Sequence, residues 1–92
     1  MSRDLIEIRE RTSGTTAPYI VGTRIRVSDI AGQYSLAKDA GVEPVAYIAA
    51  AYPHLSRAEI KAAISYWRSH KADIDAEIAA DEAVLRQIPT RT

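Results

Sequence analysis

The sequence predicts a mainly α-helical domain, in which a short N-terminal β-strand or hairpin precedes a three-helix helix-turn-helix unit and a C-terminal helical extension. Three observations predict it. Sixteen of the 92 residues are alanine, the strongest helix former. Helix start and stop signals recur from Ser28 onward, and apolar and polar residues alternate near the N-terminus. We expect one domain, 1–92, with a β-ribbon at 5–27, the three-helix unit at 28–70 and an acidic helical tail at 71–92.

The first 27 residues have the patterns of short strands. Within residues 5–11, Ile6 and Ile8 alternate with charged side chains, which is typical of a strand with one buried face. Residues 12–18 are rich in Ser, Thr, Gly and Pro and predict a loop. Residues 19–27 are rich in β-branched residues and have Gly22-Thr23 at their centre, which predicts a tight type II′ hairpin. Because such short strands are unstable alone, the hairpin should pack on the helices or pair with a strand of another chain.

Two helices are expected next. Ser28 is the candidate N-cap of the first helix, and Gly41 supplies the left-handed residue that ends it. Pro44 suits the first turn of the second helix, and Pro53 forces its end. The second helix is therefore expected to be short, and most of its residues are apolar.

The third helix has the clearest start in the chain. Ser56 and Glu59 have the spacing of a capping box, and Leu55 and Ile60 occupy the hydrophobic-staple positions. No glycine or proline follows before Pro89, so we expect the helix to continue into the tail, either straight or kinked.

The second and third helices, joined by the four-residue link 52–55, have the layout of a helix-turn-helix. Four polar residues of the third helix fall within about 80° of one another on a helical wheel. They are Arg57, Lys61, Ser65 and Arg68. Donors beside small residues suit close approach to a DNA groove, so we assign these residues to DNA contact as a hypothesis. Two alternatives stay open: a solvated helical face, and a protein-interaction surface that never contacts DNA.

The net charge of the chain does not by itself favour binding to nucleic acid. Twelve basic residues balance twelve acidic ones, which excludes a protein that coats nucleic acid through bulk charge. The charge is unevenly placed, however, because residues 56–71 are basic and residues 72–85 are acidic. Neutrality therefore limits non-specific affinity without excluding a specific site.

Two further charged groups allow more than one interpretation. Arg24 and Arg26 lie two apart and would share one face of a strand, where they could bind phosphates or a partner's carboxylates, or pair with carboxylates of this chain such as Glu7 or Glu10. In the tail, three carboxylates recur at every fourth position and could form a solvated face, hold a hard cation or dock onto a basic partner. They are Asp73, Glu77 and Asp81. We prefer docking to a metal site, with Ile74, Ile78, Asp81 and Leu85 as the partner-binding residues.

Several function classes find no support in the sequence. The chain has no cysteine, and His54 and His70 lack a metal-ligand spacing, so we expect no metal and no disulfide. We find no nucleophile elbow, phosphate loop or catalytic carboxylate pair, and so expect no enzyme activity, catalytic residue, cofactor or small-molecule substrate. Without a membrane-length apolar run or a signal segment, the expected location is the cytoplasm, with no membrane partner.

The run P-Y-I-V-G-T-R-I-R-V-S-D-I, residues 18–30, together with Gly41 and the Y-P-H-L-S run at 52–56, resembles a family of small prokaryotic proteins, the DUF four-three-three group. The resemblance covers about residues 5–67. In that family a G-T-R-I-x-V ribbon leads into a homeodomain-like three-helix unit. The family is similar to VapB-type antitoxins, whose genes often stand beside those of PIN-like nucleases. Glu43 departs from the usual Ser/Thr cap, and Val45-Ala46 replace an acidic pair, so the second helix is more apolar than the family pattern.

The resemblance implies a homodimeric antitoxin of a type II toxin-antitoxin system. Such a protein would bind operator DNA through its helix-turn-helix and neutralise a PIN-like toxin by occluding its nuclease site. A small, alanine-rich core also favours a dimer over a lone monomer. The alternative is a protein-interaction adaptor that uses the three-helix unit without DNA contact.

Overall fold

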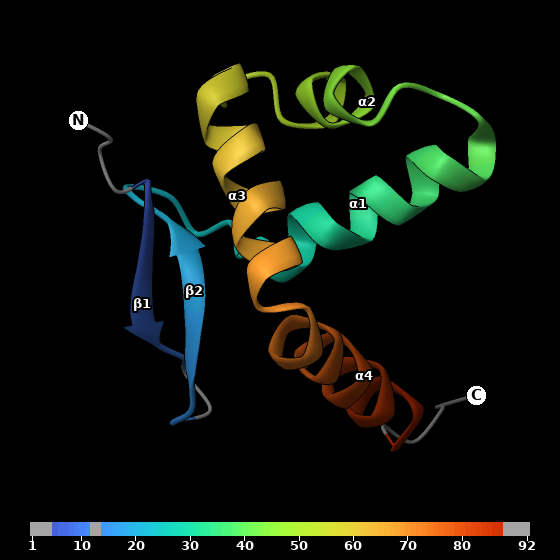
Figure 1. Cartoon of the computed structure of the whole chain (residues 1–92). Helices are drawn as coiled ribbons and strands as arrows, with labels where there is room; N and C mark the ends of the chain where they lie inside the picture. Colours follow the sequence, from blue (N-terminus) through green and yellow to red (C-terminus); the bar gives the residue numbers. More distant parts are fainter. Residues whose placement is uncertain (1–4, 12–13, 88–92) are drawn as a thin grey trace, which may run out of the picture.

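The computed structural model describes residues 5–11 and 14–87 of the chain, in which a β-hairpin lies beside a bundle of helices (Figure 1). The elements are β1 (Ile6–Glu10), β2 (Thr16–Ile20), α1 (Val27–Ala40), α2 (Pro44–Ala51), α3 (Arg57–Ser69) and α4 (Lys71–Gln87). The protein is thus mainly helical, with a short antiparallel strand pair before the helices, as the sequence predicts. No helix in this part of the chain is both long and apolar enough to span a membrane.

The strand predicted at residues 5–11 is confirmed as β1, but its partner strand differs from the prediction. β1 pairs with β2 in an antiparallel register that places Ile6 opposite Ile20 and Glu10 opposite Thr16. Residues 16–18 therefore belong to a strand and not to a loop, while residues 12 and 13 lie outside the described part. The prediction of a loop over 12–18 was wrong at its C-terminal end, because Ala17 and Pro18 are buried against the bundle.

The type II′ hairpin predicted over residues 19–27 does not form. Gly22 has a φ of 78° as the third residue of a turn whose last N–H, on Thr23, donates to the Ile20 carbonyl at 3.1 Å. A positive φ at that position is typical of a type II turn, which does not match the twist of a hairpin. Only one isolated bridge follows, between Tyr19 and Arg26, and α1 then begins at Val27.

The helix boundaries agree with the predicted signals except at the start of α1. Ser28 is not the N-cap: its Oγ donates to Glu77 of α4 at 2.9 Å, and the Asp29 carboxylate accepts from the Arg26 backbone N–H at 3.0 Å. The Ser28 hydroxyl is thus engaged by α4, and the N-cap is Arg26, two residues earlier than predicted. Gly41, with a φ of 72°, ends α1, and Pro44 begins α2, as predicted.

The helix expected to run on from α3 is interrupted at His70 and resumes in another direction as α4. The chain turns at His70, whose backbone N–H donates to the carbonyls of Tyr66 and Trp67 and whose ring stacks on Tyr66 at 4.1 Å. Across the turn, the Trp67 indole N–H donates to Asp75 at 3.0 Å. α4 therefore folds back and packs on α1, which realises the kinked alternative.

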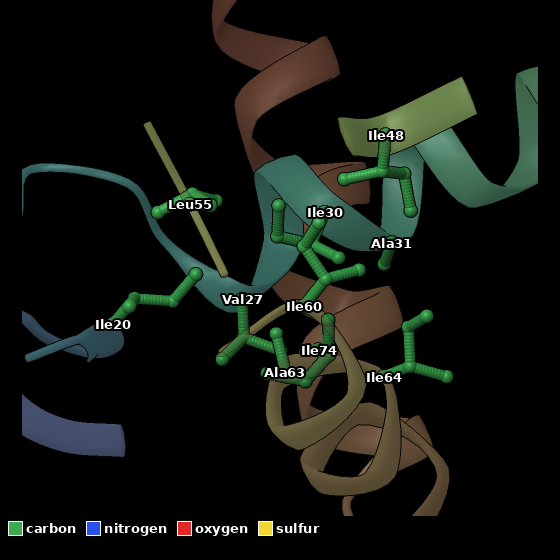
Figure 2. Packing of buried hydrophobic residues seen from close by; sticks show 10 residues of the cluster. All are labelled: Ile20, Val27, Ile30, Ala31, Ile48, Leu55, Ile60, Ala63, Ile64 and Ile74. Atoms are coloured by element: carbon green, nitrogen blue, oxygen red, sulfur yellow. The ribbon is translucent and has the colours of Figure 1, made fainter. Parts of the chain in front are cut away.

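The core lies where the hairpin, α1, α2, α3 and α4 meet (Figure 2). It consists of Ile20, Val27, Ile30, Ala31, Ile48, Leu55, Ile60, Ala63, Ile64 and Ile74. Isoleucine supplies most of the large side chains, and α2 contributes only Ile48 as a fully buried residue. Burial of each such side chain stabilises the fold by about 1.5–3 kcal/mol. The core fixes the angle at which α3 presents its outer face.

Candidate nucleic-acid interface and the acidic helix

The turn between α2 and α3 is held by caps at both helix starts. Ser56 and Glu59 form the predicted capping box: the Glu59 N–H donates to Ser56 Oγ at 3.1 Å, and the Ser56 N–H donates to Glu59 Oε1 at 2.8 Å. Leu55 and Ile60, the staple residues, are both buried. α3 therefore starts at a defined point, which a helix that enters a groove by its N-terminal end requires.

Glu43 caps α2 although the family pattern has Ser or Thr there. Its carboxylate accepts from the backbone N–H groups of Val45 at 2.9 Å and Ala46 at 3.0 Å. These two hydrogen bonds, followed by the charges of Arg57 and Lys61, hold the pKa of Glu43 below its ordinary value. One carboxylate thus lies within the electrostatic reach of the basic face of α3.

All four residues assigned to DNA contact are exposed and lie on one face of α3. Lys61, Ser65 and Arg68 border a surface hollow of about 410 Å³, which also touches Tyr34 of α1 and the start of α2. Arg57 lies one turn before Lys61 and outside the hollow. The structure therefore brings three of the predicted residues together around one depression and places the fourth beside it.

Tyr34 of α1 also belongs to this face. Arg68 donates a hydrogen bond to the Tyr34 hydroxyl at 3.0 Å, and its guanidinium lies 5.7 Å from the ring centroid. The Tyr34 ring also packs edge-on against Trp67 at 5.3 Å. Tyr34 thus holds Arg68 in one orientation. No described carboxylate forms an ion pair with Arg57, Lys61 or Arg68. No sequence signal links positions 34 and 68, because the contact joins two helices.

The two arginines predicted to share a strand face have different surroundings. Arg26 Nη1 lies 2.9 Å from Glu77 Oε2 and 3.0 Å from Asp81 Oδ2, and its side chain is only 20% exposed. Burial opposes its charge, but Asp29, Asp81 and Glu77 outweigh that effect and raise its pKa. Arg24 is exposed, and its side chain forms no hydrogen bond or ion pair with the residues described. The alternative in which the arginine pairs within the chain holds for Arg26.

The three carboxylates on the acidic face of α4 also differ in their surroundings. Glu77 accepts from Arg26 and Ser28, and Asp81 accepts from Arg26 and from Arg11 at 3.2 Å, while Asp73 is exposed. The predicted row of carboxylates is thus largely matched by arginines of the N-terminal half. Within residues 5–11 and 14–87, no group of three His, Cys, Asp or Glu side chains has a geometry suited to a metal ion.

The residues of the tail that were assigned to partner binding also differ in burial and in contacts. Ile74 is 1% exposed and belongs to the core of this chain, and Ile78 packs partly buried against that core. Asp81 is engaged by Arg26 and Arg11. The side chain of Leu85 lies outside the described part. In this conformation the inner face of α4 serves the fold itself, and Ile78 borders a groove that α4 forms with α1.

The comparison with known families is decisive for the central part of the chain. A family described as "Protein of unknown function (DUF433)" matches residues 14–67, more than half of the sequence. The chain belongs to the DUF433 family. No curated protein and no solved structure matches the chain significantly. In this DUF433 protein the family match spans β2 to α3, so β1 and all of α4 lie outside it.

Proposed function

We propose that this DUF433 protein is the homodimeric antitoxin and autoregulator of a type II toxin-antitoxin system. Its role is to bind operator DNA through α2 and α3 and to neutralise a PIN-like nuclease by covering its active site. Neutralisation requires no chemistry by this chain and no cofactor, and both activities belong in the cytoplasm. The resemblance to VapB-type antitoxins, together with the family membership, motivates the toxin half of the proposal.

The observation that carries the DNA half is the distribution of paired and unpaired charge. Carboxylates of α4 are matched by Arg11 and Arg26, so the acidic tail does not neutralise α3. Among the residues described, Arg57, Lys61 and Arg68 keep their charges on one exposed face. A chain of zero net charge therefore presents a locally positive helix at the second position of a helix-turn-helix, where phosphate and base contacts are made.

The DNA half is tested by binding to the promoter region of the chain's own gene across a series of salt concentrations. Each neutralised phosphate releases counterions, so affinity should fall steeply with salt, and Arg57→Gln or Lys61→Gln should each lower the salt slope by about 1. Lys38→Gln is the matched control, because Lys38 is an exposed cation at the end of α1. Absence of binding, or an equal effect of all three variants, would refute the DNA half.

The toxin half is tested separately. Co-expression with the product of an adjacent nuclease gene should yield a stable complex that lacks nuclease activity. If no complex forms and the nuclease stays active, the toxin half fails whatever the DNA experiment shows.

A second candidate, an adaptor that binds a protein partner without DNA, is favoured by one observation. Leu36 and Val42, at the end of α1 and just after it, leave 53% and 44% of their surface exposed. Charge reversal at Lys61 and Arg68 separates the two functions. An adaptor keeps its partner in the double variant and shows no DNA binding before or after the change.

A further inference from the structure

The outer edge of β1 carries a backbone pattern that is open for pairing. In Figure 1, β2 lies between β1 and the helices, so the other edge of β1 faces away from the bundle. Hydrogen bonds from Val21 N–H to the Leu5 carbonyl and from Arg11 N–H to the Thr15 carbonyl mark the pairs joined to β2. Because such pairs alternate along an antiparallel ladder, the intervening residues turn their N–H and C=O groups to the outer edge. These residues are Ile6, Ile8 and Glu10.

The opposite edge of the hairpin is closed. The Ile20 N–H, which points away from β1, donates to the Ile25 carbonyl at 2.9 Å. Pro18 has no N–H, and proline on an edge strand prevents further pairing. β1 has no proline, and no described residue pairs with its outer edge. Only one side of this two-stranded sheet is therefore suited to a third strand.

Ile8, at the centre of the open edge, is unusually exposed for an isoleucine in a strand. Its surface is 56% exposed, and it borders a hollow of about 460 Å³ that the hairpin forms with the end of α3 and with α4. Pro18, Tyr66 and Ile74 line the same hollow. An edge strand presents unpaired backbone N–H and C=O groups, which can pair with a strand of another chain.

We propose that β1 pairs antiparallel with β1 of a second copy of this chain, in the register that places the two Ile8 residues opposite each other. This register pairs the outward backbone groups of each copy with those of the other. Within each chain Arg9 Nε already lies 3.1 Å from Glu7 Oε2, and these side chains are 37% and 40% exposed. The register places Glu7 of each copy opposite Arg9 of the other, so the two ion pairs meet with opposite charges facing each other. Opposite charges across a strand pair stabilise it.

Neighbouring registers are disfavoured by the same two charges. Outward groups still meet when the centre of symmetry moves by one residue, to Glu7 or to Arg9. A centre at Glu7 places two carboxylates opposite each other, and a centre at Arg9 places two guanidinium groups there. Like charges directly opposite are destabilising. The sequence Glu7-Ile8-Arg9 is therefore complementary to itself only when Ile8 is the centre.

The pairing turns two hairpins, each marginal alone, into one four-stranded sheet. It joins the copies through a strand that lies outside the family match, and leaves the basic face of α3 free in both. The inference deepens the homodimer of the proposed function, and its test requires neither DNA nor toxin.

Cross-linking tests the register directly, since the chain has no cysteine of its own. In the proposed dimer the Cα atoms of residue 8 lie about 5.5 Å apart, which a disulfide spans. Ile8→Cys should therefore form an oxidised dimer at least about tenfold faster than Leu36→Cys, a control on the exposed end of α1. Equal rates, or faster cross-linking of the control, would overturn the proposal.

Sedimentation of the full-length chain supplies the second measurement. Wild type should sediment at twice the chain mass of 10.1 kDa, and Ile8→Pro, which removes an outward N–H without touching the ladder to β2, should weaken the dimer by at least about tenfold. A wild-type monomer throughout a dilution series overturns both this register and the dimer of the proposed function. A dimer that persists unchanged in Ile8→Pro overturns only the β1 pairing. If Ile8→Pro loses its helical circular dichroism, the cysteine rates decide.

Discussion

The contact between Arg26 and α4 predicts a stability effect large enough to measure. Arg26 lies at the start of α1 and bridges Glu77 and Asp81 at 2.9 and 3.0 Å. The three side chains are 20%, 13% and 33% exposed, so the cluster lies between a surface ion pair and a buried one. Surface pairs contribute about 0–1 kcal/mol, whereas removal of one partner from a buried pair costs about 3–5 kcal/mol.

We therefore expect Arg26→Ala to lower the free energy of unfolding by about 2–3 kcal/mol, since Glu77 would lose its only cationic partner in the described structure. In a domain of this size that corresponds to a fall in Tm of about 10–20 °C. The loss stays below the buried limit because Asp81 keeps Arg11 at 3.2 Å. Urea denaturation followed by circular dichroism measures the free energy, and a thermal scan measures the Tm.

Arg24→Ala is the matched control, because Arg24 is exposed and its side chain forms no hydrogen bond or ion pair with the described residues. Its effect should stay within about 0.5 kcal/mol. A double-mutant cycle with Glu77→Gln should return a coupling of about 1–2 kcal/mol between the two side chains. If Arg26→Ala destabilises no more than Arg24→Ala, or if the coupling is zero, the cluster does not hold α4 to α1.

Two further predictions concern the helix starts that position α3. Ser56→Ala removes the capping-box acceptor and should lower the free energy of unfolding by about 1 kcal/mol, seen as a Tm lower by about 4–8 °C. Ser65→Ala, at an exposed position of the same helix, is the control and should leave Tm nearly unchanged. Equal Tm values for the two variants would contradict the cap. The pKa of Glu43 is lowered in the folded chain, so its contribution to stability is present above its ordinary pKa and is lost as pH falls through the folded value. Urea midpoints of wild type should therefore fall more steeply below about pH 5 than those of Glu43→Gln, and parallel pH curves would show that the carboxylate contributes nothing at α2.

Local signals in the sequence were sufficient for most of the helical framework. The capping box at Ser56, the left-handed Gly41 and the prolines around α2 act within a few residues, so their structural effect can be read from neighbours along the chain. The exposed basic face of α3 follows from helical periodicity alone. These elements include all four residues assigned to DNA contact.

The errors arose where distant segments compete for the same groups. Ser28 has the chemistry of an N-cap, but Glu77, 49 residues further along the chain, takes its hydroxyl. Residues 19–27 have strand propensity, but the turn at Gly22 is type II and not the predicted type II′, and β1 pairs with β2. Strand pairing depends on packing and partner availability more than on local preference.

The sequence by itself determined that this chain is a helical domain with a basic helix and an acidic tail. Only the tertiary structure decided how those charges meet. Arg11 and Arg26 pair with Glu77 and Asp81 across the fold, so these two carboxylates do not neutralise the basic face of α3. The physical reason is range: helix caps act over one turn, whereas ion pairs between α4 and the N-terminal half exist only after the chain has folded back on itself.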